Sequence, residues 1–261
     1  MFTKRQEFVS LKDYNWLAKQ KHAGRCVANI LNACGIAIES GPPNLFLRDL
    51  EELAVKYLDE MECLPTFKNY RGFPSSICTS VNEQLVHGVV TDYKLVDGDV
   101  ITIDLGATYQ GVIADAARTF IYGTPKSKEI VRMLKVCEEA LNVGIKAAKV
   151  GARLGAVGHS IHKYVKDSGF SLITKYGGHG IDFNKPHAEP FVSNRANIND
   201  GIRIHSGLTI AIEPMLVMGD TKTKVIDDKW TVIASGIACH YEHSIFIDSD
   251  FTHIVTEYNA N

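Results

Sequence analysis

The 261-residue sequence lacks the features that would assign it to a membrane, secretory or nucleic-acid-binding class. No apolar run approaches the roughly 20 residues that a membrane-spanning helix needs, and the first residues lack the apolar core of a signal peptide. An excess of one charge is also missing, because 28 Lys and Arg residues face 30 Asp and Glu residues. The resulting net charge of −2 gives no reason to expect a membrane partner or specific nucleic-acid recognition.

Cysteine is present, but without the spacing of a zinc ribbon or of a disulfide framework. The six cysteines are scattered and form no C-x-x-C pair: Cys26, Cys34, Cys63, Cys78, Cys137 and Cys239. Such a distribution is typical of reduced thiols in a reducing compartment. Together with the missing signal peptide, it predicts a cytoplasmic protein.

Low-complexity segments and long linkers are absent as well, so we expect one domain over residues 1–261. Apolar periodicity and turn residues predict four helices and an intervening strand, with mostly strand and loop after the last helix. The expected helices cover residues 11–34, 44–62, 126–150 and 154–167. Gly35 is expected to end the first helix, and Asn44 to cap the second.

Residues 97–119 read as a β-hairpin, because two β-branched runs flank a glycine-containing turn. If Tyr109 and Gln110 form the turn centre, Asp104 lies directly opposite Asp115. Opposed carboxylates on neighbouring strands repel one another, so such a pair usually holds a proton or a cation. Two acids at solvated strand ends remain the alternative reading of the hairpin alone.

The sequence of residues 98–104 is similar to that of residues 207–213. Each is an apolar strand that is opened by Gly and closed six residues later by a carboxylate, Asp104 or Glu213. Both halves of the chain also carry two helices followed by strand elements. The pattern favours a duplicated α+β unit, which would bring Asp104 and Glu213 to equivalent places around a shared centre.

His179 stands between Gly178 and Gly180, which lets the backbone approach a ligand closely, although a structural histidine is the alternative. With acids at further strand ends, the candidate set becomes Asp104, Asp115, His179, Glu213 and Glu242. Oxygen-rich sets with one nitrogen suit Mn²⁺, Fe²⁺, Co²⁺ or Zn²⁺. Two-metal aminopeptidase sites hold their ions about 3.5–4 Å apart and activate a water. Four carboxylates in one cleft are compatible with about two divalent ions.

Several motifs occur in the order found in one family of peptidases. They are Cys78-Thr-Ser-Val-Asn-Glu-Gln-Leu-Val-His87-Gly88, Gly178-His179-Gly180-Ile181, His187-x-Glu189-Pro190, Ile212-Glu213-Pro214-Met215, Trp230-Thr231-Val232 and Tyr241-Glu242-His243. The chain thereby resembles type I methionine aminopeptidases over nearly its whole length. The resemblance implies the α+β pita-bread fold, a curved antiparallel sheet backed by helices with internal pseudo-twofold symmetry. It implies one catalytic domain without the N-terminal zinc-finger extension of larger forms.

The resemblance also implies roles for individual residues. The metal ligands would be Asp104, Asp115, His179, Glu213 and Glu242, with Asp104 bidentate and with Asp115 and Glu242 bridging two ions. Glu213 would also act as general base or proton shuttle. His87 and His187 would not bind metal but would hydrogen-bond the substrate and steady the tetrahedral intermediate. A methionine pocket would be formed by Tyr70, Phe73, Cys78 and Trp230.

The implied activity is removal of the initiator methionine from nascent proteins when the second residue is small, with two ions of Co, Mn, Fe or Zn. A monomer that associates transiently with the ribosome is implied as well. Two departures affect the pocket: Pro186 stands before His187 where an aromatic is frequent, and residues 230–241 are about two residues short. Two alternative functions are considered. One is an X-Pro peptidase of the same fold, and the other is a non-catalytic binding module, in which metal-ligand residues would have been replaced. His205, His240 and His243 receive no role.

Overall fold

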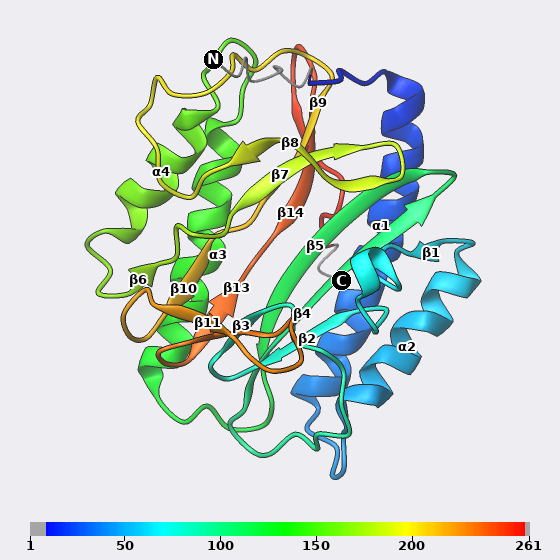
Figure 1. The fold of residues 1–261 in the computed structure, drawn as a ribbon, viewed down its shortest axis with the longest axis vertical. Helices are drawn as coiled ribbons and strands as arrows, with labels where there is room; N and C mark the ends of the chain where they lie inside the picture. The colour runs from blue at the N-terminus through cyan, green and yellow to red at the C-terminus, as the bar shows by residue number, and fades with distance from the viewer. Residues whose placement is uncertain (1–8, 259–261) are drawn as a thin grey trace.

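A computed structural model describes residues 9–258 of the chain (Figure 1). This part contains four α-helices, a single 3₁₀ turn at Tyr70–Gly72 and fifteen strands. The helices are α1 (Tyr14–Glu39), α2 (Leu47–Glu60), α3 (Lys128–Ala147) and α4 (Gly155–Val165). The strands are β1 (Leu64–Pro65), β2 (Cys78–Val81), β3 (Gln84–Val86), β4 (Val100–Tyr109), β5 (Val112–Ile121), β6 (Ser171–Leu172), β7 (Gly178–Asp182), β8 (Lys185–Val192), β9 (Leu208–Ile212), β10 (Met215–Val217), β11 (Thr223–Val225), β12 (Val232–Ala234), β13 (Ala238–His240), β14 (His243–Ile247) and β15 (Thr252–Ile254).

The four predicted helices are present, but the predicted ends of the first two are wrong. Helix α1 continues through Gly35 to Glu39. Gly35 serves packing instead, because a Cβ at this position would lie 2.5 Å from the ring of Phe120. Asn44 has a left-handed backbone (φ 71°) and precedes the start of α2. The N-cap is Phe46, whose N–H donates to the Asp49 carboxylate at 2.8 Å.

Strands β4 and β5 form the predicted hairpin, but the predicted register is wrong by two residues. Tyr109 pairs with Val112, so Gln110 and Gly111 occupy the turn with φ of 49° and 80°. Asp104 therefore lies opposite Ala117, and Asp115 lies opposite Gly106. A shift of two residues keeps each side chain on its expected face of the sheet, since side chains alternate with a period of two. The two carboxylates are diagonal neighbours on one face.

All strand pairs of the described residues are antiparallel, and they form four small sheets. The first holds the hairpin with β1 and β2 beside β4, and another runs in the order β15-β14-β9-β7-β8. Strand β10 lies between β13 and β6, and β12 lies between β11 and β3. The expectation of an α+β fold with an antiparallel sheet is confirmed.

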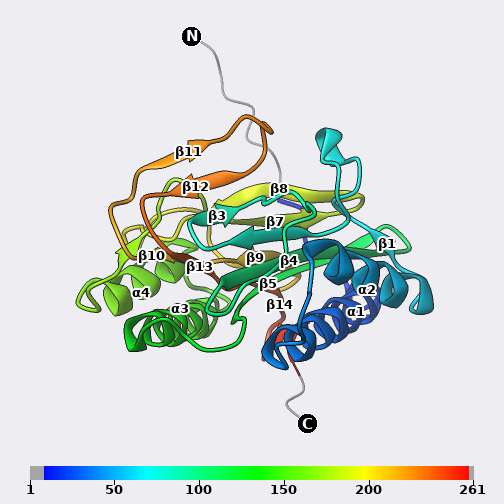
Figure 2. The same ribbon diagram turned by 90° about the horizontal axis from the view of Figure 1, so that it is seen from below.

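The helices lie along one side of the strands, as Figure 2 shows. Helices α1 and α2 pack beneath the hairpin half, and α3 packs against β9, β10 and β13 with α4 beside it. The two largest apolar clusters follow this division, one around α1 and the hairpin and one around α3, α4, β9 and β14. This arrangement agrees with the repeated α+β unit expected from the sequence. None of the helices in residues 9–258 combines the length and apolar character needed to cross a bilayer.

Candidate metal centre

Five separate segments bring the predicted ligands to one cavity. Asp104 lies in β4, Asp115 in β5 and His179 in β7, while Glu213 follows β9 and Glu242 connects β13 to β14. All five side chains are buried, and all five line the same cavity of about 370 Å³. Residues up to 138 positions apart in the sequence therefore converge as expected, since 242 minus 104 is 138.

Three hydrogen bonds hold together the segments that carry Asp115 and Glu242. The N–H of Asp115 donates to the Ser244 hydroxyl at 2.8 Å, and that hydroxyl donates back to the Asp115 carbonyl at 2.8 Å. Two residues along β5, the Ala117 carbonyl accepts from the N–H of Glu242 at 2.9 Å. These bonds link β5 to β14 and fix the backbone from which Asp115 and Glu242 reach the cavity.

His179 is held in one orientation by its neighbours. A Cβ at Gly178 would lie 2.1 Å from the Ala211 carbonyl oxygen, and a Cβ at Gly180 would lie 2.0 Å from that of Glu189. The two glycines therefore let β7 fit between β8 and β9. Nδ1 of His179 lies 3.1 Å from the Gly180 carbonyl oxygen, to which it donates. This hydrogen bond leaves the lone pair of Nε2 free to bind a metal ion.

The spacing around Nε2 of His179 suits an ion between the ligand atoms. Nε2 lies 3.7 Å from Glu213 Oε1, 3.9 Å from Glu242 Oε1 and 4.0 Å from Asp115 Oδ2. These distances exceed those of hydrogen bonds. Ligand bonds of about 2.0–2.2 Å would put two atoms around one metal ion about 3–4 Å apart. The observed separations agree with that range.

Three buried carboxylate oxygens have no hydrogen-bond partner anywhere in the described chain: Asp104 Oδ1, Asp115 Oδ1 and Glu242 Oε1. Buried polar atoms are rarely left unpaired, so these oxygens have the character of metal ligands. Ligand atoms lie within 4.8 Å of one another in three groups: Asp104, Asp115 and Glu242; His179, Glu213 and Glu242; Asp115, His179 and His187. The residues present therefore fit a divalent metal centre.

Burial makes three of the acids reluctant to ionise. It raises the pKa of Asp104 and of Glu242 well above the ordinary range, and the negative charges of Asp115 and Glu213 add to the effect. Burial also raises the pKa of Asp115 to about 6, against the opposing influence of His179. A divalent cation in the cavity would reverse this preference and allow the carboxylates to be charged together.

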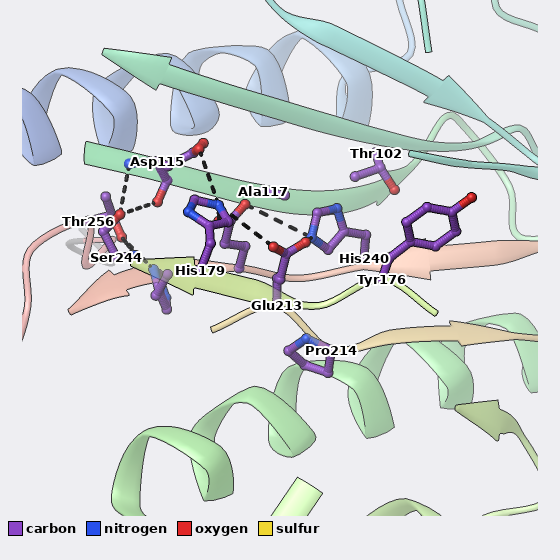
Figure 3. A network of polar contacts seen from close by, with 12 residues as sticks. Thr102, Asp115, Ala117, Tyr176, His179, Glu213, Pro214, His240, Ser244 and Thr256 are labelled. Atoms are coloured by element: carbon purple, nitrogen blue, oxygen red, sulfur yellow. Dashed lines mark hydrogen bonds and ion pairs between the residues drawn. The ribbon is translucent and has the colours of Figure 1, made fainter. Parts of the chain in front are cut away.

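Glu213 is in a different environment. Burial favours its neutral form, but contacts with the imidazoles of His240 and His179 outweigh burial and lower its pKa. Glu213 Oε2 lies 3.4 Å from Nε2 of His240, and Oε1 faces His179 (Figure 3). Glu213 is therefore the acid of the set most easily ionised.

The predicted methionine pocket is an apolar corner of the same cavity. Phe73 and Cys78 are buried in one cluster with Phe67, and Trp230 packs against it. The rings of Phe73 and Trp230 meet edge to face with centroids 5.3 Å apart. Tyr70 also lines the cavity, but its ring packs 5.3 Å from that of His187. Three of the four predicted residues thus form the apolar wall, and Tyr70 lies beside the histidine.

His87 and His187 line the cavity outside the group of five. Burial lowers the pKa of His87, and burial together with the nearby His179 lowers the pKa of His187 to about 3. Both imidazoles are therefore neutral at physiological pH. His87 has a left-handed backbone (φ 58°), an uncommon conformation that is frequent at functional sites. The ring of His187 lies 4.5 Å from that of His179.

His240 is the residue at this site that the sequence argument missed. Its side chain is buried and lines the cavity beside Glu213 and Glu242. One available signal was its position two residues before Glu242, because alternate residues of an extended segment share a face.

Comparison with known proteins places this geometry in a family. Residues 18–249 match the model of metallopeptidase family M24. The methionine aminopeptidase of Mycoplasma capricolum is 39% identical over 251 residues, which cover 95% of this chain and 98% of that protein. The crystal structure of the methionine aminopeptidase from Thermotoga maritima matches with a TM-score of 0.91 and 34% identity, over 96% of this chain and 100% of that one.

A more distant relative shares only the fold. The prolidase from Pyrococcus furiosus matches with a TM-score of 0.74 and 20% identity, and the matching region covers 66% of its length. The full-length matches and the conserved pita-bread architecture together lead to one assignment. The chain belongs to metallopeptidase family M24, in which it groups with the type I methionine aminopeptidases.

Proposed function

We propose that this protein is a metal-dependent methionine aminopeptidase that removes the N-terminal methionine of nascent proteins when the second residue is small. The observation that carries the proposal is the convergence of four carboxylates and one imidazole on a buried cavity with an apolar corner. Relatives that match almost the whole chain are methionine aminopeptidases. We propose that residues 1–261 belong to one catalytic domain.

We assign the metal ligands to Asp104, Asp115, His179, Glu213 and Glu242 and propose that they hold two divalent ions. Two of the three groups of ligand atoms consist only of these five residues, and Glu242 belongs to both. The identity of the ions follows availability in the cell, since Mn²⁺, Fe²⁺, Co²⁺ and Zn²⁺ all accept such ligands. When bound, the ions polarise the scissile carbonyl and make water nucleophilic at neutral pH.

Glu213 is the candidate for proton transfer. Its pKa is lowered by the two imidazoles beside it, so its carboxylate is ready to accept a proton from the attacking water. The same carboxylate then delivers that proton to the departing amine. Its position between His179 and His240 keeps it within the cavity during both steps.

His87 and His187 are proposed to bind the substrate peptide. Both are neutral, both line the cavity, and His87 lies outside every group of ligand atoms found in the described residues. A neutral imidazole donates one hydrogen bond, which stabilises the negative oxygen that develops during hydrolysis. These residues orient the peptide bond without holding the metal.

Selectivity for methionine is assigned to Phe73, Cys78 and Trp230, with Tyr70 at the side of His187. Methionine has a flexible and polarisable side chain that packs well against aromatic rings and sulfur. Burial raises the pKa of the Cys78 thiol well above its ordinary range, so Cys78 stays neutral and apolar. The pocket therefore favours an uncharged, unbranched side chain.

The proposal is tested by cleavage assays with purified protein and three peptides, Met-Ala-Ser, Leu-Ala-Ser and Ala-Pro-Ser. We expect release of methionine from Met-Ala-Ser with Mn²⁺, Co²⁺ or Fe²⁺, loss of activity with a chelator, and recovery when metal is restored. Preferred cleavage of Ala-Pro-Ser would instead indicate an X-Pro aminopeptidase. A protein that binds no transition metal and cleaves none of the peptides would be a binding module.

We further propose that the enzyme acts in the cytoplasm as a monomer that meets nascent chains at the ribosome. The substrate itself supports this proposal, because an initiator methionine becomes available as the chain leaves the ribosome. Sedimentation of the protein with purified ribosomes at low and physiological salt tests the association. Sedimentation equilibrium of the protein alone tests the monomer.

A further inference from the structure

The imidazole of His240 is buried without the partners that a buried polar group normally has. Its residue is 1% exposed, and neither ring nitrogen forms a hydrogen bond to any residue between 9 and 258. Buried side-chain nitrogens are usually paired, and leaving one unpaired is destabilising. A purely structural site would more readily be filled by an apolar side chain. A buried imidazole at this position therefore indicates a role in the cavity that it lines.

The backbone of His240 is held firmly. The Thr119 hydroxyl donates to the His240 carbonyl at 2.8 Å and accepts from its N–H at 3.0 Å. Thr102 lies opposite Thr119 in the hairpin, and their hydroxyl oxygens are 2.8 Å apart. Since the Thr119 proton goes to the carbonyl, Thr102 is the donor of that last bond. Two buried threonines thus fix the backbone from which the ring projects.

The ring of His240 faces one carboxylate oxygen of each of two proposed metal ligands, Glu213 and Glu242. Nε2 of His240 lies 3.4 Å from Glu213 Oε2 and 3.9 Å from Glu242 Oε2. On the other side, Nε2 of His179 lies 3.7 Å from Glu213 Oε1 and 3.9 Å from Glu242 Oε1. Each carboxylate therefore presents one oxygen to each imidazole. Figure 3 shows Glu213 between the two rings.

We propose that His240 is a positioning residue that acts through Glu213. With a metal ion bound, its Nε2–H would donate to Glu213 Oε2, which lies 3.4 Å away, and would keep Oε1 on the side of the cavity where His179 lies. A partner of this kind orients a ligand and raises its affinity for metal without binding the ion. The inference rests on the metal centre proposed above. It adds a positioning residue to the five metal ligands that the family resemblance implies.

The test compares three variants of the full-length protein. His240→Leu removes the donor and keeps the site filled, while His240→Gln retains an N–H donor on a side chain of similar reach. Cys239→Ala is the control, because Cys239 is equally buried on β13 but packs in the apolar cluster of α3. Each protein is stripped with chelator and titrated with Co²⁺ by calorimetry and by visible absorption.

We expect His240→Leu to weaken Co²⁺ binding by about 10–100-fold, the range usual for such partners. His240→Gln should recover affinity to within about threefold, with the visible bands of the wild type. Cys239→Ala should bind Co²⁺ like the wild type. The absorption bands report the atoms bound to the ion, so they do not respond to a change in folding stability alone.

Two results with the His240 variants would overturn the assignment. If His240→Leu keeps the Co²⁺ affinity and the visible absorption bands of the wild type, His240 contributes only packing. Shifted bands in His240→Gln would show that the ring binds the ion directly. If His240→Leu does not fold, the bands and affinity of His240→Gln still decide between positioning and ligation. A wild-type protein that binds no Co²⁺ would refute the proposed metal centre itself, and the role of His240 with it.

Discussion

Glu213 differs from the other acids of the site in the groups that face it. Burial, with nearby negative charges, raises the pKa values of Asp104 and Glu242, whereas the imidazoles of His240 and His179 outweigh burial and lower the pKa of Glu213. In the same cavity, a cation would favour ionisation of Asp104 and Glu242, whereas the neighbouring imidazoles favour ionisation of Glu213. This contrast is the physical basis for giving Glu213 the proton-transfer role.

Replacing Glu213 with Gln should lower kcat for Met-Ala-Ser by at least about 10²–10⁴-fold, because the amide cannot accept the proton. The substitution preserves size, so the far-ultraviolet circular dichroism spectrum should be unchanged. Steady-state kinetics at saturating metal measure the effect. A kcat near that of the wild type would exclude Glu213 as the base.

Replacing His87 with Ala should lower kcat by about 10²–10³-fold, the usual effect of losing one donor to the developing oxyanion. Metal content should stay at the wild-type level, because His87 belongs to none of the ligand groups found in residues 9–258. Elemental analysis beside the kinetics separates the two effects. Loss of metal in proportion to activity would make His87 a ligand.

The candidate metal ligands could be predicted from the sequence because residue type and local pattern indicate them. Carboxylates after apolar strands and a histidine between glycines indicated the five residues that the fold brings together. His240 could not be assigned a role, because its closest carboxylate oxygen, at 3.4 Å, belongs to Glu213 on another segment. Its position two residues before Glu242 was visible in the sequence, but its contact with Glu213 was not.

Glycine positions show how an element can be misread. Gly35 has the character of a helix end, yet α1 continues through it because Phe120 of β5 needs the space. The hairpin turn likewise falls at Gln110 and Gly111, where the left-handed backbone suits glycine. Both errors arise from contacts or turn geometry that propensity alone does not contain.

The glycines beside His179 give an element-level prediction. Replacing Gly180 with Ala should destabilise the protein by about 1–3 kcal/mol, since the new Cβ would meet the Glu189 backbone oxygen at 2.0 Å. Urea unfolding measures the change. Gly219→Ala is a matched control, because its Cβ would meet the movable hydroxyl of Ser235. Equal stability of the two variants would contradict the close fit of β7.

The turn between β14 and β15 is organised by Asp248. Its carboxylate accepts hydrogen bonds from the N–H groups of Asp250 and Phe251 at 2.9 and 2.7 Å and pairs with the His253 ring at 2.7 Å. The contact with His253, followed by the backbone donors, lowers the pKa of Asp248 to about 2. A lowered carboxyl pKa stabilises the fold above the ordinary value near 4, and this contribution disappears as the pH falls toward 2.

Asp248→Asn should therefore be less stable than the wild type at pH 7, and the difference should shrink as the pH falls from about 4 toward 2. Urea unfolding across this range measures both proteins, with Asp250→Asn as the control from the same turn. A difference that persists at the lowest pH would show that the charge of Asp248 is not the cause.

Two helix pairs and the strands above them give the molecule its overall plan. The hairpin half supplies Asp104 and Asp115, and the other half supplies His179, Glu213 and Glu242. The repeated strand pattern allowed this plan to be anticipated, because it placed Asp104 and Glu213 around a shared centre. The distances within that centre could not be predicted from the sequence. They depend on how β5 contacts β14 and how β9 pairs with β14 and β7.

The most direct test of the metal centre is an anomalous diffraction map from crystals of this protein soaked with Mn²⁺. We predict two peaks about 3.5–4 Å apart within bonding distance of Asp104, Asp115, His179, Glu213 and Glu242. A map with no peak among these five side chains, from crystals of protein that cleaves Met-Ala-Ser with Mn²⁺, would contradict the account.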